Sequence, residues 1–169
     1  MTNSLKKLAD ESLLDGFRSM MRSFPTGVAV VTALDEAGEP VGMTCSAVCS
    51  VTLAPPTLLV CLRVGPTLKA VTGGKIFAVN FLHSKARAVA ELFASGAADR
   101  FDHVTWAAGA NGGPRLVRDA HVIACCRVSK TEPVGDHVVV FGEVETVEEQ
   151  DGHRPLLYGR RRYHAWPSH

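Results

Sequence analysis

The sequence predicts a mainly β protein that folds as a small antiparallel β-barrel with two or three flanking helices. Six or seven runs of apolar and β-branched residues are separated by short turns, and short turns join antiparallel strands. Closing such a sheet into a barrel removes its exposed edges. The 169 residues are 46% hydrophobic and 21% charged, which favours a packed core and argues against disorder. No repeat or linker divides the chain, so we expect one domain over residues 1–169.

The first expected element is a helix over residues 12–24. Apolar residues recur there at helical spacing, Ser12 and Asp15 are suited to capping its start, and the Phe24-Pro25 pair would end it. The apolar positions are Leu13, Leu14, Phe17, Met20, Met21 and Phe24. We expect this apolar stripe to be core or a contact between subunits.

Strands dominate the rest of the chain. The apolar, β-branched runs that predict them span residues 28–34, 41–53, 57–64, 76–82, 121–132 and 137–149. The last two are joined by a short turn and should form a hairpin, since the second alternates apolar and polar residues. A short helical turn is expected over 67–72, and a helix from a cap at Ser84 to about Phe93. Residues 96–115 are rich in Gly, Ala, Asn and Asp and are expected to be irregular.

The charge balance excludes several classes of partner. Eighteen basic and 17 acidic residues give a net charge of +1, which provides no long-range attraction to nucleic acid or to an anionic membrane. No apolar stretch is long enough to cross a bilayer, and the first residues carry acids and lack the apolar core of a secretory signal. We therefore expect a cytoplasmic protein. The dense basic run at residues 160–162 is either a solvated face or a local anion contact.

The cysteines and histidines do not predict a metal site. The five cysteines lack the C-x2-C pairs of structural zinc sites and are expected to be free thiols. The seven histidines are scattered, without an H-E-x-x-H motif.

Small and hydroxyl-bearing residues gather between Gly42 and Thr52, in the segment GMTCSAVCSVT. Small side chains allow a planar ligand to approach the backbone, where N–H groups and hydroxyls can donate hydrogen bonds to it. A polar edge strand would have the same composition, so both interpretations stay open.

Other catalytic motifs are missing. G-x-S-x-G, the phosphate-binding P-loop and G-x-G-x-x-G are all absent, which leaves neither a marked nucleophile nor a Rossmann-type nucleotide site. His137 stands out because it follows Gly135-Asp136 at the start of a strand, a position that can aim an imidazole into a cleft. A histidine exposed on a surface turn is the competing interpretation.

Taken in order, FPTGVAVVT, GMTCSAVCSVTLAPP, NFL, GDH and GRRRYH resemble the flavin reductase family of two-component flavin-dependent monooxygenases, from about Phe17 to Tyr163. The resemblance implies a split antiparallel β-barrel that works as a homodimer, with flavin near the subunit interface. It also implies reduction of FMN or FAD by NADH or NADPH, followed by release of the reduced flavin to a separate monooxygenase. Ala47 and Cys49 depart from the family pattern, which often has hydroxyl residues at these positions.

The resemblance also assigns residues to the site. The implied flavin contacts are Thr26, Gly27, Thr44, Cys45, Ser46, Ser50, Val51, Thr52, Asn80, Phe81, Leu82, Ser84, Lys85, Arg100 and Phe101. Among these, Ser84 and Lys85 would suit a phosphate. His137 would face the nicotinamide as the catalytic residue, and Tyr163 and the arginines before it, residues 160–162, would border the dinucleotide.

The implied chemistry is hydride transfer between two stacked cofactor rings, which the protein orients. Backbone donors along residues 44–52 would stabilise the negative charge that develops on the flavin ring. Three alternatives remain: a flavin-binding or storage protein without nicotinamide chemistry, an FMN-dependent oxidase similar to pyridoxamine phosphate oxidases, and a structural barrel without a ligand.

Overall fold

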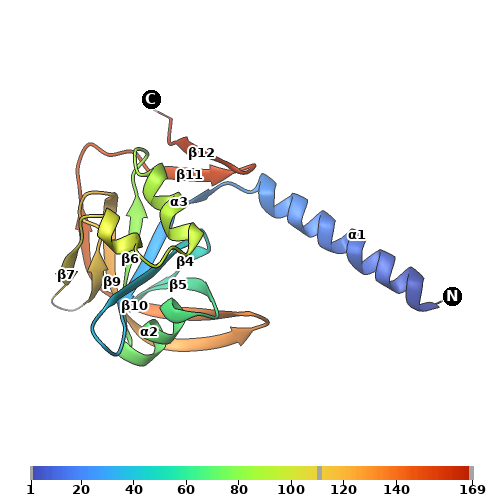
Figure 1. The fold of residues 1–169 in the computed structure, drawn as a ribbon, viewed down its shortest axis with the longest axis horizontal. Helices are drawn as coiled ribbons and strands as arrows, with labels where there is room; N and C mark the ends of the chain where they lie inside the picture. Colours follow the sequence, from blue (N-terminus) through green and yellow to red (C-terminus); the bar gives the residue numbers. More distant parts are fainter. Residues whose placement is uncertain (1, 110–111, 168–169) are drawn as a thin grey trace.

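A seven-stranded antiparallel sheet forms the body of the protein in the computed structural model, which describes residues 2–109 and 112–167 (Figure 1). The strand order is β3-β2-β6-β9-β10-β5-β4. These strands are β2 (Ala29–Leu34), β3 (Pro40–Cys45), β4 (Val48–Leu53), β5 (Pro56–Arg63), β6 (Ile76–Leu82), β9 (Ala120–Val134) and β10 (His137–Glu149). Every pairing between them is antiparallel, which confirms the expected mainly β fold.

Two smaller sheets and a few helices flank this body. One sheet has the order β1-β11-β12, and the other pairs β7 with β8. Their strands are β1 (Thr26–Gly27), β7 (Ala107–Gly109), β8 (Gly112–Arg115), β11 (Leu156–Gly159) and β12 (Arg162–Ala165). The helices are α1 (Thr2–Ser23), α2 (Pro66–Gly74) and α3 (Arg87–Ser95), with a short 3₁₀ turn η1 (Arg100–His103). The β11–β12 hairpin and the short strand β1 have no counterpart among the predicted elements. Residues 96–115, expected to be irregular, include η1, β7 and β8, because pairing between two short segments forms a strand that local composition does not indicate.

The predicted hairpin over residues 121–149 is confirmed as β9 and β10. Val134 pairs with His137, so Gly135 and Asp136 form a two-residue turn. Gly135 has a φ of +61°, which glycine adopts without steric cost. The turn fixes the backbone position of His137 at the start of β10.

The predicted run over residues 41–53 is not one strand. It divides into β3 and β4, which lie at opposite edges of the seven-stranded sheet, so the chain must pass from one edge to the other. Ser46 and Ala47 make this passage, and the backbone N–H of Cys61 on β5 donates to the carbonyl oxygen of Ala47 at 3.1 Å. The two small residues therefore lie in the connection between β3 and β4, outside either strand.

Two helix starts also differ from the predictions. Helix α1 begins well before Ser12, so neither Ser12 nor Asp15 caps it, although it does end at Ser23, just ahead of Pro25 as expected. Helix α3 begins at Arg87 after Ala86, without a side-chain cap. Ser84 therefore lies in the turn before α3, where its backbone N–H donates to the carbonyl oxygen of Arg154.

Apolar side chains pack against both faces of the sheet. Ala29, Val31 and Ala33 of β2 belong to the larger cluster, whereas Val28 and Val30 belong to a second cluster beneath α3. Because successive side chains of a strand point to opposite faces, this strand is buried on both sides. The segments around β2 are thereby packed on both faces.

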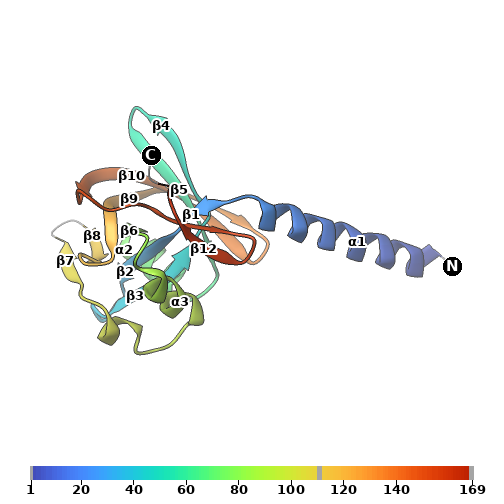
Figure 2. The ribbon, with the colours of Figure 1, turned by 90° about the horizontal axis from the view of Figure 1, so that it is seen from above.

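Helix α1 projects away from the body, as Figures 1 and 2 show from two directions. At its end, the backbone N–H of Arg160 donates to the carbonyl oxygen of Arg22 at 2.7 Å. Its apolar stripe is exposed, with Leu13 73%, Phe17 55% and Met20 56% accessible, so it is not core of this chain. Among the described residues, no helix has the length and hydropathy required to cross a bilayer.

Candidate functional site

A hollow of about 270 Å³ lies where α1, β1, the β3–β4 passage and β6 meet. We call it the central hollow; it is lined by Phe24, Pro25, Thr26, Gly27, Ala29, Ser46, Val48 and Phe81. Four of the expected flavin contacts, Thr26, Gly27, Ser46 and Phe81, are thus brought together from three separate segments. They provide two hydroxyl groups, an aromatic ring and a glycine.

Strand pairing positions Thr26 and Gly27, which come shortly after α1. Pro25 ends the helix, and Thr26 and Gly27 then pair with Tyr158 and Leu157 of β11. A Cβ atom built on Gly27 would meet no atom within 4 Å, so the hollow is open above this residue. The space and the hydroxyl groups fit a flat, polar-edged ring.

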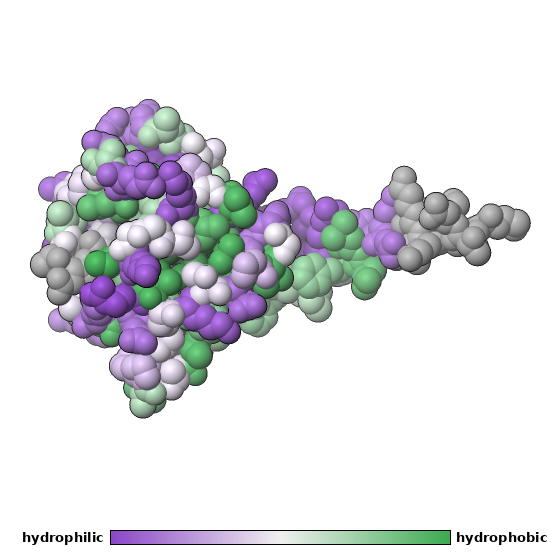
Figure 3. All heavy atoms as spheres, turned by 90° about the horizontal axis from the view of Figure 1, so that it is seen from below, coloured by the Kyte–Doolittle hydropathy of each residue, from purple (hydrophilic) through white to green (hydrophobic). Residues whose placement is uncertain are grey.

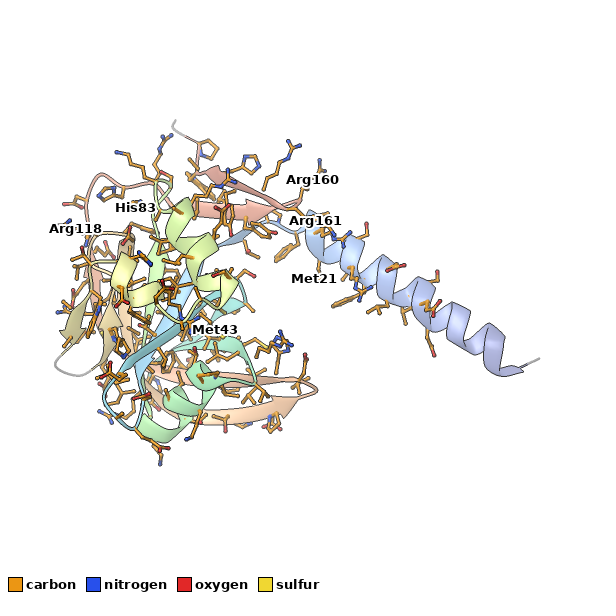
Figure 4. All side chains as sticks on the ribbon, viewed as in Figure 1. Met21, Met43, His83, Arg118, Arg160 and Arg161 are labelled. Carbon is orange, nitrogen blue, oxygen red and sulfur yellow. The ribbon has the colours of Figure 1, made fainter. Side chains whose placement is uncertain are left out.

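A second hollow, which we call the lateral hollow, lies between β3, the loop after β5 and the end of α3. It is lined by Gly42, Met43, Thr44, Arg63, Val64, Gly65, Pro66, Thr67, Phe93, Ala94, Gly96 and Arg100. It includes two further expected contacts, Thr44 and Arg100. The hydroxyl of Thr44 donates to the carbonyl oxygen of Ala90 at 2.7 Å and so ties β3 to α3 (Met43, its neighbour, is marked in Figure 4).

Cys45 does not line either hollow. It is 5% exposed in the larger core cluster, and its Sγ lies 3.5 Å from the carbonyl oxygen of Cys61. Burial raises the pKa of the Cys45 thiol, which keeps it protonated. The alternation of side chains along β3 turns Cys45 inward, away from the side on which Thr44 lies.

Strand β6 contributes only one of its three expected side chains. Asn80 is fully buried, and its Nδ2 atom donates to the carbonyl oxygen of Val30 and to the hydroxyl of Thr32, each at 3.0 Å. Leu82 is also buried, in the cluster under α3. Phe81 lies between them on the opposite face and reaches the central hollow.

Beyond Val48, the edge strand β4 lines neither hollow. Ser50, Val51 and Thr52 are exposed there, and the Thr52 hydroxyl accepts a hydrogen bond from the backbone N–H of Ala54. A single chain does not bring these three residues to the central hollow.

The turn before α3 holds Ser84 and Lys85, which line neither hollow. Its geometry is set by His83, whose Nδ1 atom accepts from the backbone N–H of Lys85 at 3.2 Å and whose Nε2 atom lies 2.9 Å from the carbonyl oxygen of Arg118. His83 and Arg118 are marked in Figure 4. Phe101, beyond α3, is buried and packs edge-on against Phe93, so its role here is in the core.

His137 has a carboxylate partner. Its Nδ1 atom lies 2.8 Å from Oδ1 of Asp136, and the hydrogen bond to His137 lowers the pKa of Asp136. His137, on β10, pairs with Arg63 of β5, which lines the lateral hollow; His137 itself lines neither hollow. The bond to Asp136 fixes the imidazole through Nδ1 and leaves Nε2 for another partner.

Tyr163 belongs to strand β12 and pairs with Tyr158 of β11. Its ring is 4.9 Å from that of Tyr158, and the Arg87 guanidinium is placed over it. Burial raises the pKa of the Tyr163 hydroxyl. Tyr163 is thus packed within the hairpin whose tip carries Arg160 and Arg161.

Sequence reasoning missed a groove beside the central hollow. It is lined by Phe17, Arg18, Met21, Arg22, Phe24, Thr26, Ser46, Tyr158, Gly159 and Arg161, and so shares Phe24, Thr26 and Ser46 with that hollow. No local sequence pattern indicates this groove, because it forms between the end of α1 and a hairpin more than 130 residues later in the chain.

Solved structures with the same fold define the class of this protein as flavin reductase-like. The flavin reductase of styrene monooxygenase from Pseudomonas putida S12 superposes with a TM-score of 0.82 at 32% identity, covering 90% of this chain and 97% of that one. An NADH:FAD oxidoreductase from Streptomyces globisporus C-1027, solved with NAD and FAD fragments, gives a TM-score of 0.81 at 31% identity, covering 89% and 91%.

Sequence comparison identifies the family of the chain. It is 54% identical over 152 residues to a flavin reductase (NADPH) from Lentzea aerocolonigenes, with 88% of each chain covered. Residues 21–167 match the family model described as "Flavin reductase like domain". The chain therefore belongs to the flavin reductase-like family, which confirms the resemblance found in its motifs.

Proposed function

We propose that this protein reduces FMN or FAD with NADH or NADPH and releases the reduced flavin to a separate monooxygenase. The observation that carries the proposal is the meeting of Thr26, Gly27, Ser46 and Phe81 in the central hollow of a chain that belongs to the flavin reductase-like family. The relatives named above are described as reductases of this kind, one of them being the reductase of a monooxygenase.

The residues of the central hollow suit a flavin ring. The hydroxyl groups of Thr26 and Ser46 can donate to ring oxygen and nitrogen atoms, and Phe81 offers an apolar surface. Gly27 has open space where a side chain would stand, so the ring can approach the backbone. When bound, a flavin and a nicotinamide would supply the chemistry, a hydride transfer from nicotinamide C4 to flavin N5.

The protein would contribute orientation and electrostatics to this reaction. His137, held by Asp136 through Nδ1, would use Nε2 to position the nicotinamide. Thr44 and Arg100 would bind the ligand from the lateral hollow. Ser84 and Lys85 would bind a flavin phosphate. Tyr163 would border the dinucleotide.

We also propose that the protein acts as a homodimer whose sheets close into split barrels. Support comes from the stripe on α1, whose large apolar side chains are 46–73% exposed. Figure 3 shows apolar side chains on α1 and on the adjoining face of the body. An exposed stripe of this kind marks an interaction surface. Ser50, Val51 and Thr52 on β4 would reach a flavin only across such an interface.

Anaerobic stopped-flow mixing tests the proposed activity. We expect the flavin absorbance to bleach when the protein with FMN or FAD meets NADH or NADPH, and the reduced flavin to separate from the protein on gel filtration. Replacement of His137 by Ala should slow bleaching and leave flavin affinity unchanged. A protein that binds flavin but never bleaches it would be a binding protein, and one that retains reduced flavin would be an oxidase-like relative.

A further inference from the structure

The tip of the β11–β12 hairpin is a two-residue turn made of Arg160 and Arg161. Gly159 pairs with Arg162 across it, and φ is +49° at Arg160 and +61° at Arg161. Turns with positive φ at both central residues favour Asn-Gly, because a Cβ atom is disfavoured there. Two arginines at these positions indicate that their side chains serve a purpose other than turn formation.

This turn is fastened to the end of α1. The backbone N–H of Arg160 donates to the carbonyl oxygen of Arg22 at 2.7 Å. Ser19, Arg22, Ser23, Arg160 and Arg161 then line one hollow of about 320 Å³. Figure 4 shows Arg160 and Arg161 at the hairpin tip, beside Met21 of α1.

The three arginines of this hollow have no acidic partner among the described residues. Of the other arginines in the described part of the chain, Arg18, Arg87, Arg115 and Arg127 are paired with a carboxylate, whereas Arg63, Arg100, Arg118, Arg154 and Arg162 are not. What distinguishes Arg22, Arg160 and Arg161 is that all three line the same hollow. The cluster of Arg22, Arg160 and Arg161 is therefore a local concentration of uncompensated positive charge. Guanidinium groups bind phosphate through paired N–H donors, which makes an anionic phosphate the ligand of matching chemistry.

The arginine hollow connects with the proposed flavin site. Arg22 and Arg161 also line the groove that contains Thr26 and Ser46, and these two residues line the central hollow. The tips of the β9–β10 and β11–β12 hairpins both lie on the side of the body from which α1 departs (Figures 1 and 2). A dinucleotide whose nicotinamide lies near His137 would therefore have the three arginines on the same side of the body.

We propose that Arg22, Arg160 and Arg161 bind the 2′-phosphate of NADPH and so favour NADPH over NADH. The inference rests on the proposed function, since it assigns the nucleotide used in that reaction. NADPH and NADH differ only in this phosphate monoester, a doubly charged group that the arginines can contact and that a ribose hydroxyl cannot replace.

The test uses an Arg160→Asn/Arg161→Gly double variant, which installs the turn sequence that the backbone prefers and removes two charges. Arg22→Gln removes the third charge separately, and Lys130→Gln, on β9, is the control for loss of an exposed charge. Steady-state kinetics are measured with NADPH and with NADH at low salt. We expect KM for NADPH to rise about tenfold in the double variant, as for loss of charge-assisted hydrogen bonds, with NADH and the Lys130→Gln control unchanged.

Three results would overturn the inference: equal changes for NADPH and NADH, no change for either, or weaker binding of FMN but not of riboflavin. The last would assign the arginines to the flavin phosphate. If wild-type protein oxidises neither nucleotide in the presence of flavin, the proposed function fails instead, so the two failures are distinguishable.

Discussion

The side-chain amide of Asn80 donates from Nδ2 to the hydroxyl oxygen of Thr32, with 3.0 Å between the two atoms. The same side chain accepts at Oδ1 from the backbone N–H of Leu116, at 2.8 Å, and the Thr32 hydroxyl donates to the carbonyl oxygen of Pro114. One buried amide therefore joins β6, β2 and the segment after β8. Phe81, the next residue, is held at the central hollow by this arrangement.

Replacement of Asn80 by Ala should lower the free energy of unfolding by about 2–3 kcal/mol, because it leaves the buried N–H of Leu116 without an acceptor. Urea denaturation followed by circular dichroism measures the loss. Ser129→Ala, an exposed hydroxyl on β9, provides a control that should differ little from wild type. An Asn80→Ala protein as stable as wild type would mean that water replaces the lost bonds.

Gly142 on β10 should not tolerate a side chain. A Cβ atom there would lie 2.5 Å from Cζ of Phe77, itself fully buried. We expect Gly142→Ala to lower the free energy of unfolding by about 1–3 kcal/mol through overpacking. Gly16→Ala in α1 is the matched control, since its Cβ would meet nothing within 4 Å. If both variants melted at the wild-type temperature, the packing around Phe77 would have to be looser than described.

The cysteines should react with thiol reagents in the order of their exposure. Burial raises the pKa of Cys45 and raises that of Cys126 to about 12, whereas Cys49 on the edge strand is exposed. Because the thiolate is the reactive form, Cys49 should be labelled first in the native protein. Mass spectrometry after brief maleimide treatment identifies the site, and Cys49→Ser should remove the fast phase. Early labelling of Cys126 would contradict this order.

The pKa of Asp136 should depend on His137. The hydrogen bond from His137 lowers the pKa of this carboxyl group below its usual value. A lowered pKa in the folded protein contributes stability above the unfolded pKa of about 4, and that contribution is lost as the pH falls through the folded value. In His137→Ala the pKa of Asp136 should rise, as measured by NMR titration of its carboxyl carbon. An unchanged titration curve would show that the two side chains do not interact in solution.

Local signals in the sequence predicted much of the fold. The alternation over residues 137–149 and the Gly135-Asp136 turn predicted the β9–β10 hairpin, and Pro25 predicted the end of α1. Such features are decided by neighbouring residues, through side-chain periodicity and the restricted backbone of proline and glycine. The family motifs likewise predicted Thr26, Gly27, Ser46 and Phe81 as neighbours, and the structure brings them together in one hollow.

Other features depended on contacts between distant segments. Cys45 and Asn80 lie within the motifs, yet their side chains are buried, because pairing within the sheet decides which face of each strand is covered. The division of residues 41–53 into two edge strands follows from their partners, β2 and β5, which propensity cannot identify.

By itself, the sequence determined the family and the mainly β fold and predicted a set of flavin contacts, because each rests on local patterns and motifs. Only the tertiary structure decided which of those side chains reach a hollow. It also decided that Arg22 lines the same hollow as Arg160 and Arg161, which are distant in the sequence. The physical reason is that burial and charge clustering arise when distant segments pack together, and no single segment carries that information.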